Sequence, residues 1–462
     1  MVNMSQWTPA LLAQARRAAR ETPARRERYV DFLRALAILL VVLGHWLAAV
    51  IVSANGMTGE NALAHLSWAH PLTWFFQVMP VFFLVGGYAN AASMDQHRRK
   101  GGDGAGWLLG RTDRLLRPTS AFIGLLWGCA LVAGLAGMDR ELVAIGVWAA
   151  SIPLWFLAAY LGVVLCAPTM YALHRRAGAA VPVLLTGAVL LLDVLRLGAG
   201  VPVVGEANYL LVWLTMHQVG FLWRDRWTRT GPLAPAGFAA AGFSLLFVLT
   251  VFGPYPVSMV DVPGEELGNA SPPTFALLVL GLSQTALALV LLGPARRMLR
   301  RTGPWTAVVA VNSVVLTLFL WHMLAAVLTG ALLHGTGLFP EPAVGSGEWL
   351  LFRLPWVLAV SVVMGVLLAV FGRVEARTAP SSAGWRAGGL LGLPPGQALW
   401  NAATWSALLA VILGLVWVAL AGPEPHGVGA LPTAAFAAYV VGASVLRLAR
   451  RRQARAAQEQ ED

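Results

Sequence analysis

Residues 29–46 read YVDFLRALAILLVVLGHW, an apolar run that contains one arginine and one histidine. A helix of this length spans the hydrocarbon core of a bilayer, and ionisable groups inside such a span are costly, so they indicate a functional site. The eleven steps from Arg34 to His45 turn the helix to within roughly 20° of its starting direction and advance it about 16 Å along its axis. Both side chains are therefore expected on one stripe, with Arg34 near a membrane surface and His45 near mid-depth.

The remainder of the chain repeats this apolar pattern. Its 462 residues are 58% hydrophobic and 12% charged, which is about half the charged share of a soluble protein, and the mean hydropathy is +0.67. Runs near 20 residues predict an all-α polytopic membrane protein rather than a β-barrel. The expected spans, with soft boundaries, are 32–53, 71–93, 118–137, 148–172, 179–198, 205–223, 233–253, 274–293, 305–333 (tilted or broken), 349–371, 400–422 and 432–448.

Positive charge lies in clusters on every second connection between these spans. The alternate connections hold almost none of the 33 Lys and Arg, with Arg140, Arg196 and Arg353 as the exceptions. This positive-inside pattern predicts a multi-pass protein of the cell membrane with both termini in the cytoplasm. Topology thus accounts for the net charge of +11, and no nucleic-acid partner is expected.

Composition divides the chain into a bundle of about ten core transmembrane helices and a two-helix C-terminal extension. The expected segments are a basic cytoplasmic segment (1–29), the main membrane domain (30–373), a cytoplasmic linker (374–399), a transmembrane hairpin (400–448) and a cytoplasmic tail (449–462). Within the first segment, residues 6–20 suit a surface helix on anionic lipid, and a basic tail without fixed structure is the alternative. No small-residue cleavage site follows the first span, so the segment is expected to be retained.

Neither a metal site nor a tightly bound cofactor is expected. Cys129 and Cys166 both fall inside apolar runs, where they are expected to pack rather than to form a disulfide. No Cys/His spacing is typical of zinc, and no glycine-rich phosphate loop or G-x-S-x-G motif occurs.

Five short motifs follow one another along the chain. The first span has an Arg-x10-His pattern at Arg34 and His45, preceded by Asp31 in an Asp-x-x-Arg arrangement. The second span contains PVFFLVGGYAN at 80–90, and the connection after it reads RTDRLLR at 111–117. The fourth and fifth motifs are PLWFLAAYLG at 153–162 and LTLFLWHM at 316–323. In this order, and on the expected sides of the membrane, they resemble the acyltransferase 3 family over roughly residues 28–372.

That family includes the O-acetyltransferases of bacterial surface polysaccharides. The resemblance implies transfer of an acyl group, with acetyl as the first candidate, from acyl-CoA to a hydroxyl of a carbohydrate-containing or other acceptor. The guanidinium forks of Arg111, Arg114 and Arg117 suit the phosphates of this cosubstrate, although topology alone also places arginines there. The residues expected to line the substrate tunnel are Asp31, Gly86, Gly87, Tyr88, Trp155 and His322.

Two positions depart from the pattern of the family. Gly86 stands where many members have Ser. The Glu that follows the L-W-F-L segment in many members is absent, and Ala158, Ala159 and Tyr160 occupy that region. The identity of the acceptor, the acyl chain length and any homo-oligomeric state are left open.

His45 is the expected catalytic residue, with Arg34 beside the donor. A neutral imidazole can take the proton of an acceptor hydroxyl as a general base, or it can carry the acyl group as a covalent relay, and both routes stay open. The structural alternative for Arg34 is an ion pair with Asp31 at i, i+3. A proton-coupled solute transporter and a non-catalytic accessory protein of glycan export are the alternative functions, because buried Arg and His also suit a carrier.

Overall fold

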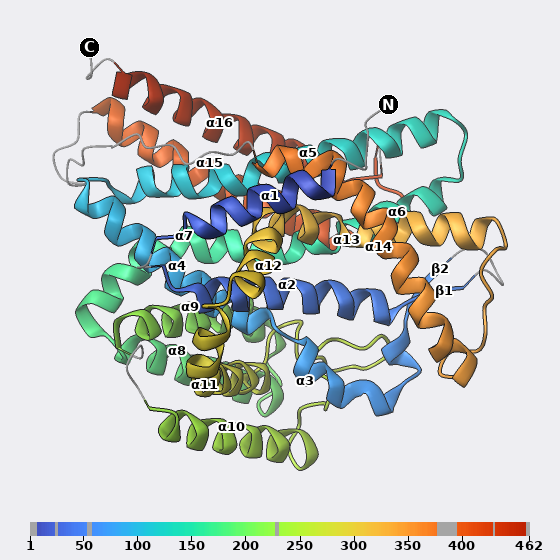
Figure 1. Cartoon of the computed structure of the whole chain (residues 1–462), viewed down its shortest axis with the longest axis horizontal. Coiled ribbons are helices and arrows are strands. Elements are labelled where there is room, and N and C mark those ends of the chain that lie inside the picture. The colour runs from blue at the N-terminus through green and yellow to red at the C-terminus, as the bar shows by residue number, and fades with distance from the viewer. Residues whose placement is uncertain are drawn as a thin grey trace.

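The computed structural model describes residues 7–23, 26–52, 58–226, 231–376, 395–427 and 430–458, and it is helical nearly throughout (Figure 1). The helices are α1 (Trp7–Arg20), α2 (Arg28–Ala48), α3 (Thr73–Phe76), α4 (Met79–Arg99), α5 (Gly104–Leu135), α6 (Arg140–Ser151), α7 (Pro153–Ala177), α8 (Ala180–Leu197), α9 (Asn208–Arg226), α10 (Leu233–Val251), α11 (Phe275–Met298), α12 (Thr302–Ser313), α13 (Val315–Gly335), α14 (Gly347–Ala376), α15 (Pro395–Leu420) and α16 (Thr433–Gln458). Among the described residues there are also three short 3-10 helices, η2 (Ala62–Ala64), η3 (Ser67–Leu72) and η4 (Pro202–Ala207).

Eleven helical segments of the described residues are long and apolar enough to cross a membrane. They confirm the prediction of an all-α, multi-pass membrane protein. The one expected span without a counterpart among the eleven is the sixth, 205–223, which corresponds to α9, a helix that contains polar residues. These polar groups have partners inside the bundle, since Gln218 Nε2 donates to the Met170 carbonyl (2.9 Å) and Asn208 Nδ2 donates to Asp193 (2.9 Å). A helix that is buried among other helices need not be apolar.

The expected span 305–333 is broken, and α12 and α13 meet at Val314. The carboxylate of Glu375, near the end of α14, accepts hydrogen bonds from the backbone N–H groups of Leu316 (3.0 Å) and Thr317 (2.7 Å). It also accepts from the Thr317 hydroxyl (2.7 Å). The first turn of α13 is therefore capped by a carboxylate from a distant part of the chain, which satisfies N–H groups that the break would leave unpaired.

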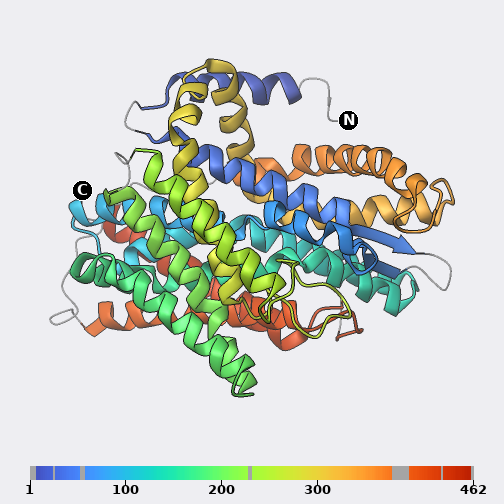
Figure 2. The same ribbon diagram turned by 90° about the horizontal axis from the view of Figure 1, so that it is seen from below.

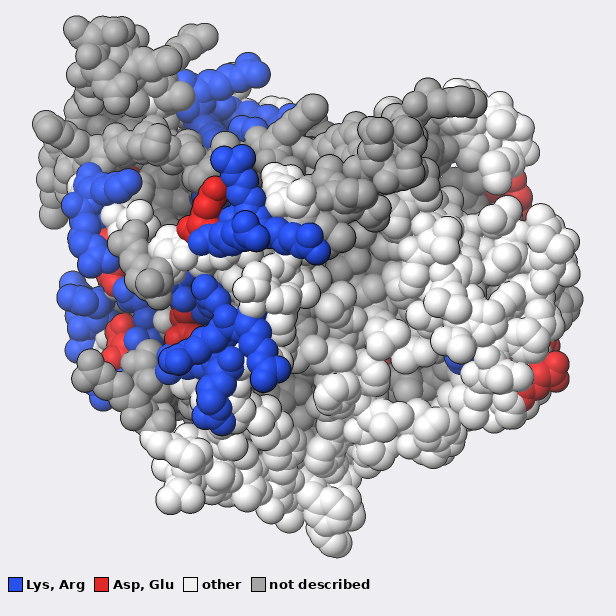
Figure 3. Space-filling view, viewed as in Figure 1, with Lys and Arg blue, Asp and Glu red and all other residues white. Residues whose placement is uncertain are grey.

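A two-stranded antiparallel hairpin continues directly from α2, and the sequence did not predict it. Strand β1 (Ala49–Val52) pairs with β2 (Thr58–Asn61) in the register Ala49↔Asn61. Figures 1 and 2 both show this hairpin at the end of the molecule far from the C terminus. On the face drawn in Figure 3, Lys and Arg gather at the other end, on the side of the C terminus, and few lie near the hairpin. This separation matches the charge clusters on alternate connections, and the cytoplasmic placement of the termini stays a prediction.

The C-terminal helices α15 and α16 lie side by side along one edge of the bundle (Figure 1), packed on each other and on α7 and α5. Glycines allow this close approach. A Cβ on Gly414 would lie 2.7 Å from the Ala435 carbonyl oxygen, and one on Gly442 would lie 2.6 Å from that of Ala407. Small residues at such contacts are a common means of packing helices in membranes.

Candidate active site

Helix α2 runs unbroken from Arg28 to Ala48, so the stripe that joins Arg34 to His45 exists as predicted from the sequence. The carboxylate of Glu27 caps its first turn by accepting from the Tyr29 N–H (3.3 Å), and the Ala49 N–H closes its last turn on the His45 carbonyl. Both Arg34 and His45 are half-buried. The helix therefore carries a guanidinium near its start and an imidazole near its end.

His45 lies next to His322 of α13. Their ring centroids are 5.1 Å apart and the rings are tilted by 47°. His45 Nδ1 donates to the Val41 carbonyl (2.9 Å), and His322 Nδ1 donates to the Phe319 carbonyl (2.6 Å). Because a carbonyl oxygen can only accept, these contacts assign the Nδ1–H tautomer to both neutral rings, which leaves the lone pair on Nε2. Within the described residues neither Nε2 has a hydrogen-bond partner, and that of His322 is buried.

Two tryptophans fix the histidine pair relative to the surrounding helices. Trp46, the residue after His45, donates its indole N–H to the His322 carbonyl (2.9 Å). Trp356 of α14 in turn donates its indole N–H to the Trp46 carbonyl (2.8 Å). Helices α2, α13 and α14 are therefore joined by hydrogen bonds at the level of the two imidazoles.

At the other end of α2, Asp31 holds two arginines. Arg34 Nη1 donates to Asp31 Oδ1 (3.2 Å), and Arg26 Nε donates to Asp31 Oδ2 (2.6 Å). The hydrogen bond to Asp31 raises the pKa of the Arg26 guanidinium, which precedes the membrane span. Asp31 itself is held through its backbone carbonyl, which accepts from Asn312 Nδ2 (2.9 Å). The i, i+3 ion pair considered from the sequence is thus present, and it orients Arg34 rather than excluding a role for it.

Arg111 of α5 lies within electrostatic range of Arg34. Its Nη2 donates to the hydroxyl of Tyr160 on α7 (2.9 Å), and its buried Nε has no hydrogen-bond partner in the described part of the chain. Tyr160 also fills the space next to Gly86, where an added Cβ would lie 3.2 Å from the tyrosine ring. Sequence reasoning did not include Tyr160 in the site, since no motif marks which helix faces Arg111.

The three predicted phosphate-binding arginines have different surroundings. Arg111 points inward, whereas Arg114 and Arg117 are exposed. Arg117 pairs with Asp113 (3.0 Å), and Arg450 of α16 also forms an ion pair with Asp113. Arg114 forms no ion pair with any described residue and lies within electrostatic range of Arg111. Arg111 and Arg114 are therefore the two positions that could bind an anion without breaking an ion pair.

Gly87 is a packing position between α4 and α9. An added Cβ would lie 2.0 Å from the His217 carbonyl oxygen, and a Cβ on Gly220 would lie 2.1 Å from the Leu84 carbonyl oxygen. The two glycines thus let the helix backbones touch. Close by, Asn90 Nδ2 donates to Nε2 of His217 (3.0 Å), and both side chains are fully buried.

The other two tunnel candidates lie beside aromatic side chains. The Tyr88 ring packs edge-on against Trp223 with 5.4 Å between centroids, and Tyr88 is within electrostatic range of Glu27, at the start of α2. Trp155 is half-buried against Phe156 (6.4 Å), whose ring contacts that of Phe319 at 5.1 Å. Tyr88 therefore lies near the end of the site that contains Arg34, and Trp155 lies on the side of the end that contains His322.

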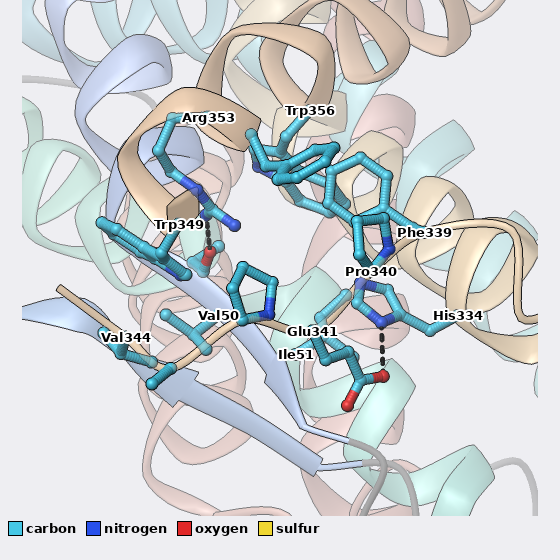
Figure 4. Close-up of a pocket in the computed structure, with 14 residues that line it drawn as sticks. Val50, Ile51, His334, Phe339, Pro340, Glu341, Val344, Trp349, Arg353 and Trp356 are labelled. Carbon is cyan, nitrogen blue, oxygen red and sulfur yellow. Dashed lines mark hydrogen bonds and ion pairs between the residues drawn. The ribbon is translucent and has the colours of Figure 1, made fainter. Parts of the chain in front are cut away.

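A cavity of about 250 Å³ lies beyond the C-terminal end of α2 (Figure 4). Its wall begins with Ala49, Val50 and Ile51, which directly follow α2, and continues with residues from the end of α13, the connection 339–344 and the start of α14. No motif in the sequence marks this cavity. Among the described residues, no group of three or more His, Cys, Asp and Glu could hold a metal ion.

Comparison with known proteins identifies the family. The model of the acyltransferase 3 family, described as an acyltransferase domain, matches residues 27–373, well over half of the chain. The matched region contains Arg34, His45, Arg111 and His322 and ends before α15. No curated protein and no solved structure matches the chain. The chain therefore belongs to the acyltransferase 3 family, and it is a membrane acyltransferase.

Proposed function

We propose that the protein transfers an acyl group, with acetyl as the first candidate, from acyl-CoA to a hydroxyl of a carbohydrate-containing or other acceptor. The observation that carries this proposal is the pair of imidazoles, His45 and His322, each with its Nδ1 hydrogen-bonded and its Nε2 free. A free Nε2 in a site bounded by helices suits proton transfer or acyl transfer. Membership in an acyltransferase family favours this function over the transporter and the accessory protein.

In the general-base route, His45 Nε2 accepts the proton of the acceptor hydroxyl as its oxygen attacks the thioester carbonyl. The tetrahedral intermediate collapses and breaks the C–S bond, and the CoA thiolate recovers the proton from Nε2. The products are the ester and free CoA. His322 helps in this route by fixing the position of the His45 ring.

In the relay route, His45 Nε2 attacks the thioester, CoA thiolate leaves, and the acyl group is carried on the imidazole. The acceptor hydroxyl then attacks the acyl-imidazolium, and the released proton passes to Nε2 of His322, 5.1 Å away between ring centroids. The acyl group moves to the acceptor oxygen, His45 is regenerated, and the proton on His322 finally goes to the CoA thiolate or to solvent. Both routes use the same pair of histidines.

The donor is proposed to bind at the opposite end of α2. Arg34 and Arg111 lie within electrostatic range of each other, and Arg114, which forms no ion pair with any described residue, adds a third charge. Repulsion between like charges held close together raises the free energy of the unliganded protein, and an anionic ligand bound between them relieves it. We therefore place phosphates of acyl-CoA at Arg111 and Arg114, with the thioester directed along α2 toward His45. No tightly bound cofactor is part of this proposal.

The test uses full-length protein in detergent with acetyl-CoA labelled in the acetyl group and a sugar-containing hydroxyl acceptor. His45→Ala should lower transfer about 100-fold or more, because positioned acid–base catalysis contributes that much. Arg34→Ala should lower it through weaker donor binding. His65→Ala is the matched control, because His65 is a surface histidine paired with Glu60. Transfer by His45→Ala at the wild-type rate would refute the proposal.

A second measurement separates the two routes. Labelled acetyl-CoA is mixed with the protein in the absence of acceptor, and label that remains on the denatured protein is counted. Label retained by wild type and absent from His45→Ala indicates the relay. No label on either protein, together with normal transfer when acceptor is present, indicates the general base.

A further inference from the structure

The cavity beyond α2 holds a cationic side chain that lacks an acidic partner. Arg353, near the start of α14, donates from Nη1 to the Ala49 carbonyl (2.8 Å). Its guanidinium lies over the ring of Trp349 (4.3 Å to the centroid) and near that of Trp356 (5.8 Å). Its Nε is buried without a hydrogen bond, and Arg353 forms no ion pair with any residue that the structure describes. A shielded guanidinium without a carboxylate leaves its charge uncompensated, which favours an anion as ligand.

The charge pattern also sets Arg353 apart. It is one of three positive residues that lie on the side of the predicted spans where the positive-inside pattern places almost none. Topology therefore gives no reason for a charge at this position. The two tryptophan faces and the Ala49 carbonyl hold the guanidinium in one orientation, so its remaining N–H donors are pre-organised toward the cavity.

The wall of the cavity is linked to the histidine pair through the end of α2 and through two hydrogen bonds. Ala49 is four residues after His45, which is an axial distance of about 6 Å on a helix. Trp356, which lines the cavity, is hydrogen-bonded to the Trp46 carbonyl, and Trp46 is hydrogen-bonded to the His322 carbonyl. A ligand in the cavity would thus lie next to the end of α2 that carries His45, on the side away from the donor arginines.

The lining is suited to a small ring with polar groups at both ends. Figure 4 shows Arg353 on one side of the cavity and the His334–Glu341 pair on the other, with Phe339 and Pro340 beside His334. His334 Nδ1 lies 2.8 Å from Glu341 Oε1. A volume of about 250 Å³ is just below the range of about 300–1,000 Å³ for pockets that take drug-sized ligands, so it accommodates one ring rather than an oligosaccharide.

We propose that this cavity binds the acceptor through an anionic group, a carboxylate or a phosphate, on a sugar ring. The anion binds Arg353, the aromatic walls cover the ring, and His334 and Glu341 bind its hydroxyls. The role as an acceptor site rests on the proposed function, whereas the preference for an anionic ring can be measured without any acyl transfer. This inference names a chemical class for the acceptor and makes Arg353 its specificity-determining residue.

The test is calorimetric titration of the full-length protein in detergent with three probes, glucuronate, glucose 1-phosphate and glucose. The wild type should bind the two anionic sugars about tenfold or more tightly than glucose, as a charge-assisted hydrogen bond allows. The comparison of glucuronate with glucose 1-phosphate shows which anion is preferred. Arg353→Gln should remove the preference over glucose, and Arg353→Lys should keep part of it, because lysine retains the charge but not the fork.

Arg140→Gln is the matched control. Arg140 is exposed, it is another of the three exceptions to the charge pattern, and it does not line the cavity. Its removal should leave the preference unchanged. Equal binding of the three probes, no binding of any of them, or a preference that survives Arg353→Gln would overturn the proposal. If Arg353→Gln does not fold, inorganic phosphate should still displace both anionic sugars from the wild type, and failure to do so has the same meaning.

His45→Ala distinguishes this inference from the proposed function. It should bind the anionic sugars like the wild type, because His45 does not line the cavity. If His45→Ala kept full acyl transfer, the catalytic proposal would be lost while the binding preference stood. If the preference were absent while His45→Ala was inactive, the catalytic proposal would stand and the acceptor site would be lost.

Discussion

His45 and His322 lie with their ring centroids 5.1 Å apart, and each ring is held by a backbone carbonyl of its own helix. The two rings come from the first and the ninth of the twelve predicted spans, so the pair exists only when α2 and α13 are packed together. Each ring has its Nδ1 hydrogen-bonded to a carbonyl, so Nε2 is the atom of each ring that can take up a proton. Two imidazolium ions there would repel each other.

Replacement of His322 by Gln should lower the transfer rate by about 10- to 100-fold, up to the lower limit of what a positioned proton acceptor contributes. The protein should still bind acetyl-CoA, because the donor arginines are at the other end of α2. Single-turnover kinetics checks this expectation. If the relay route operates, His322→Gln should accumulate acyl-enzyme, and an unchanged deacylation rate would argue against a role in proton transfer.

The donor arginines should respond unequally to substitution by Gln. Arg111→Gln and Arg114→Gln should each raise KM for acetyl-CoA by about tenfold, the usual size for one charge-assisted contact to phosphate. Arg117→Gln should change KM much less, because Arg117 is already paired with Asp113. The measurement is KM for acetyl-CoA of each of the three variants at two salt concentrations. Equal effects at all three positions would indicate general attraction rather than specific contacts.

Tyr160→Phe removes the hydroxyl that accepts from Arg111 and keeps the ring that packs beside Gly86. Arg111 would lose its only hydrogen bond to a described residue, at a cost of about 1 kcal/mol, and its position would become less defined. KM for acetyl-CoA should rise several-fold while kcat changes little. Tyr160→Phe combined with Arg111→Gln should be no worse than Arg111→Gln alone, and additive effects would show that Tyr160 acts independently.

Gly87→Ala should destabilise the protein by about 1–3 kcal/mol, the usual cost of overpacking, because the new methyl would lie 2.0 Å from the His217 carbonyl oxygen. Thermal unfolding in one detergent provides the measurement. Gly124→Ala in α5 is the control, since nothing lies within 4 Å of its added Cβ. The control should be neutral or slightly more stable, as helix propensity predicts. Similar unfolding temperatures for the two variants would mean that α4 and α9 can separate easily.

The helical spans and the stripe on α2 could be predicted because both depend on local sequence. Hydropathy is a property of consecutive residues, and the phase between Arg34 and His45 follows from the geometry of one helix. The same logic predicted a span at 205–223, where the structure has α9, but α9 is not among the eleven segments that are long and apolar enough to cross a membrane. His322 was expected in the site because it lies in the motif LTLFLWHM at 316–323, not because of helix geometry.

Contacts between helices could not be predicted in this way. The hydrogen bond from Arg111 to Tyr160 forms only when α5 and α7 are rotated about their axes so that the two side chains face each other. The sequence of either helix alone does not specify that rotation. The break at Val314 depends on Glu375, about sixty residues later in the chain. Arg353 was recognised only as an exception to the charge pattern, because its stacking on Trp349 requires the first turns of α14 to be known.

Asp113 forms ion pairs with one arginine inside the region that the family model matches and with one outside it. Arg117 lies within the matched region 27–373, whereas Arg450 lies on α16, well beyond it. The single negative charge of Asp113 is therefore shared between two positive partners, and the cationic character of this end of α5 is larger than the family domain alone would give. A protein cut after residue 373 would keep every motif of the family and would still differ in charge where the donor is proposed to bind.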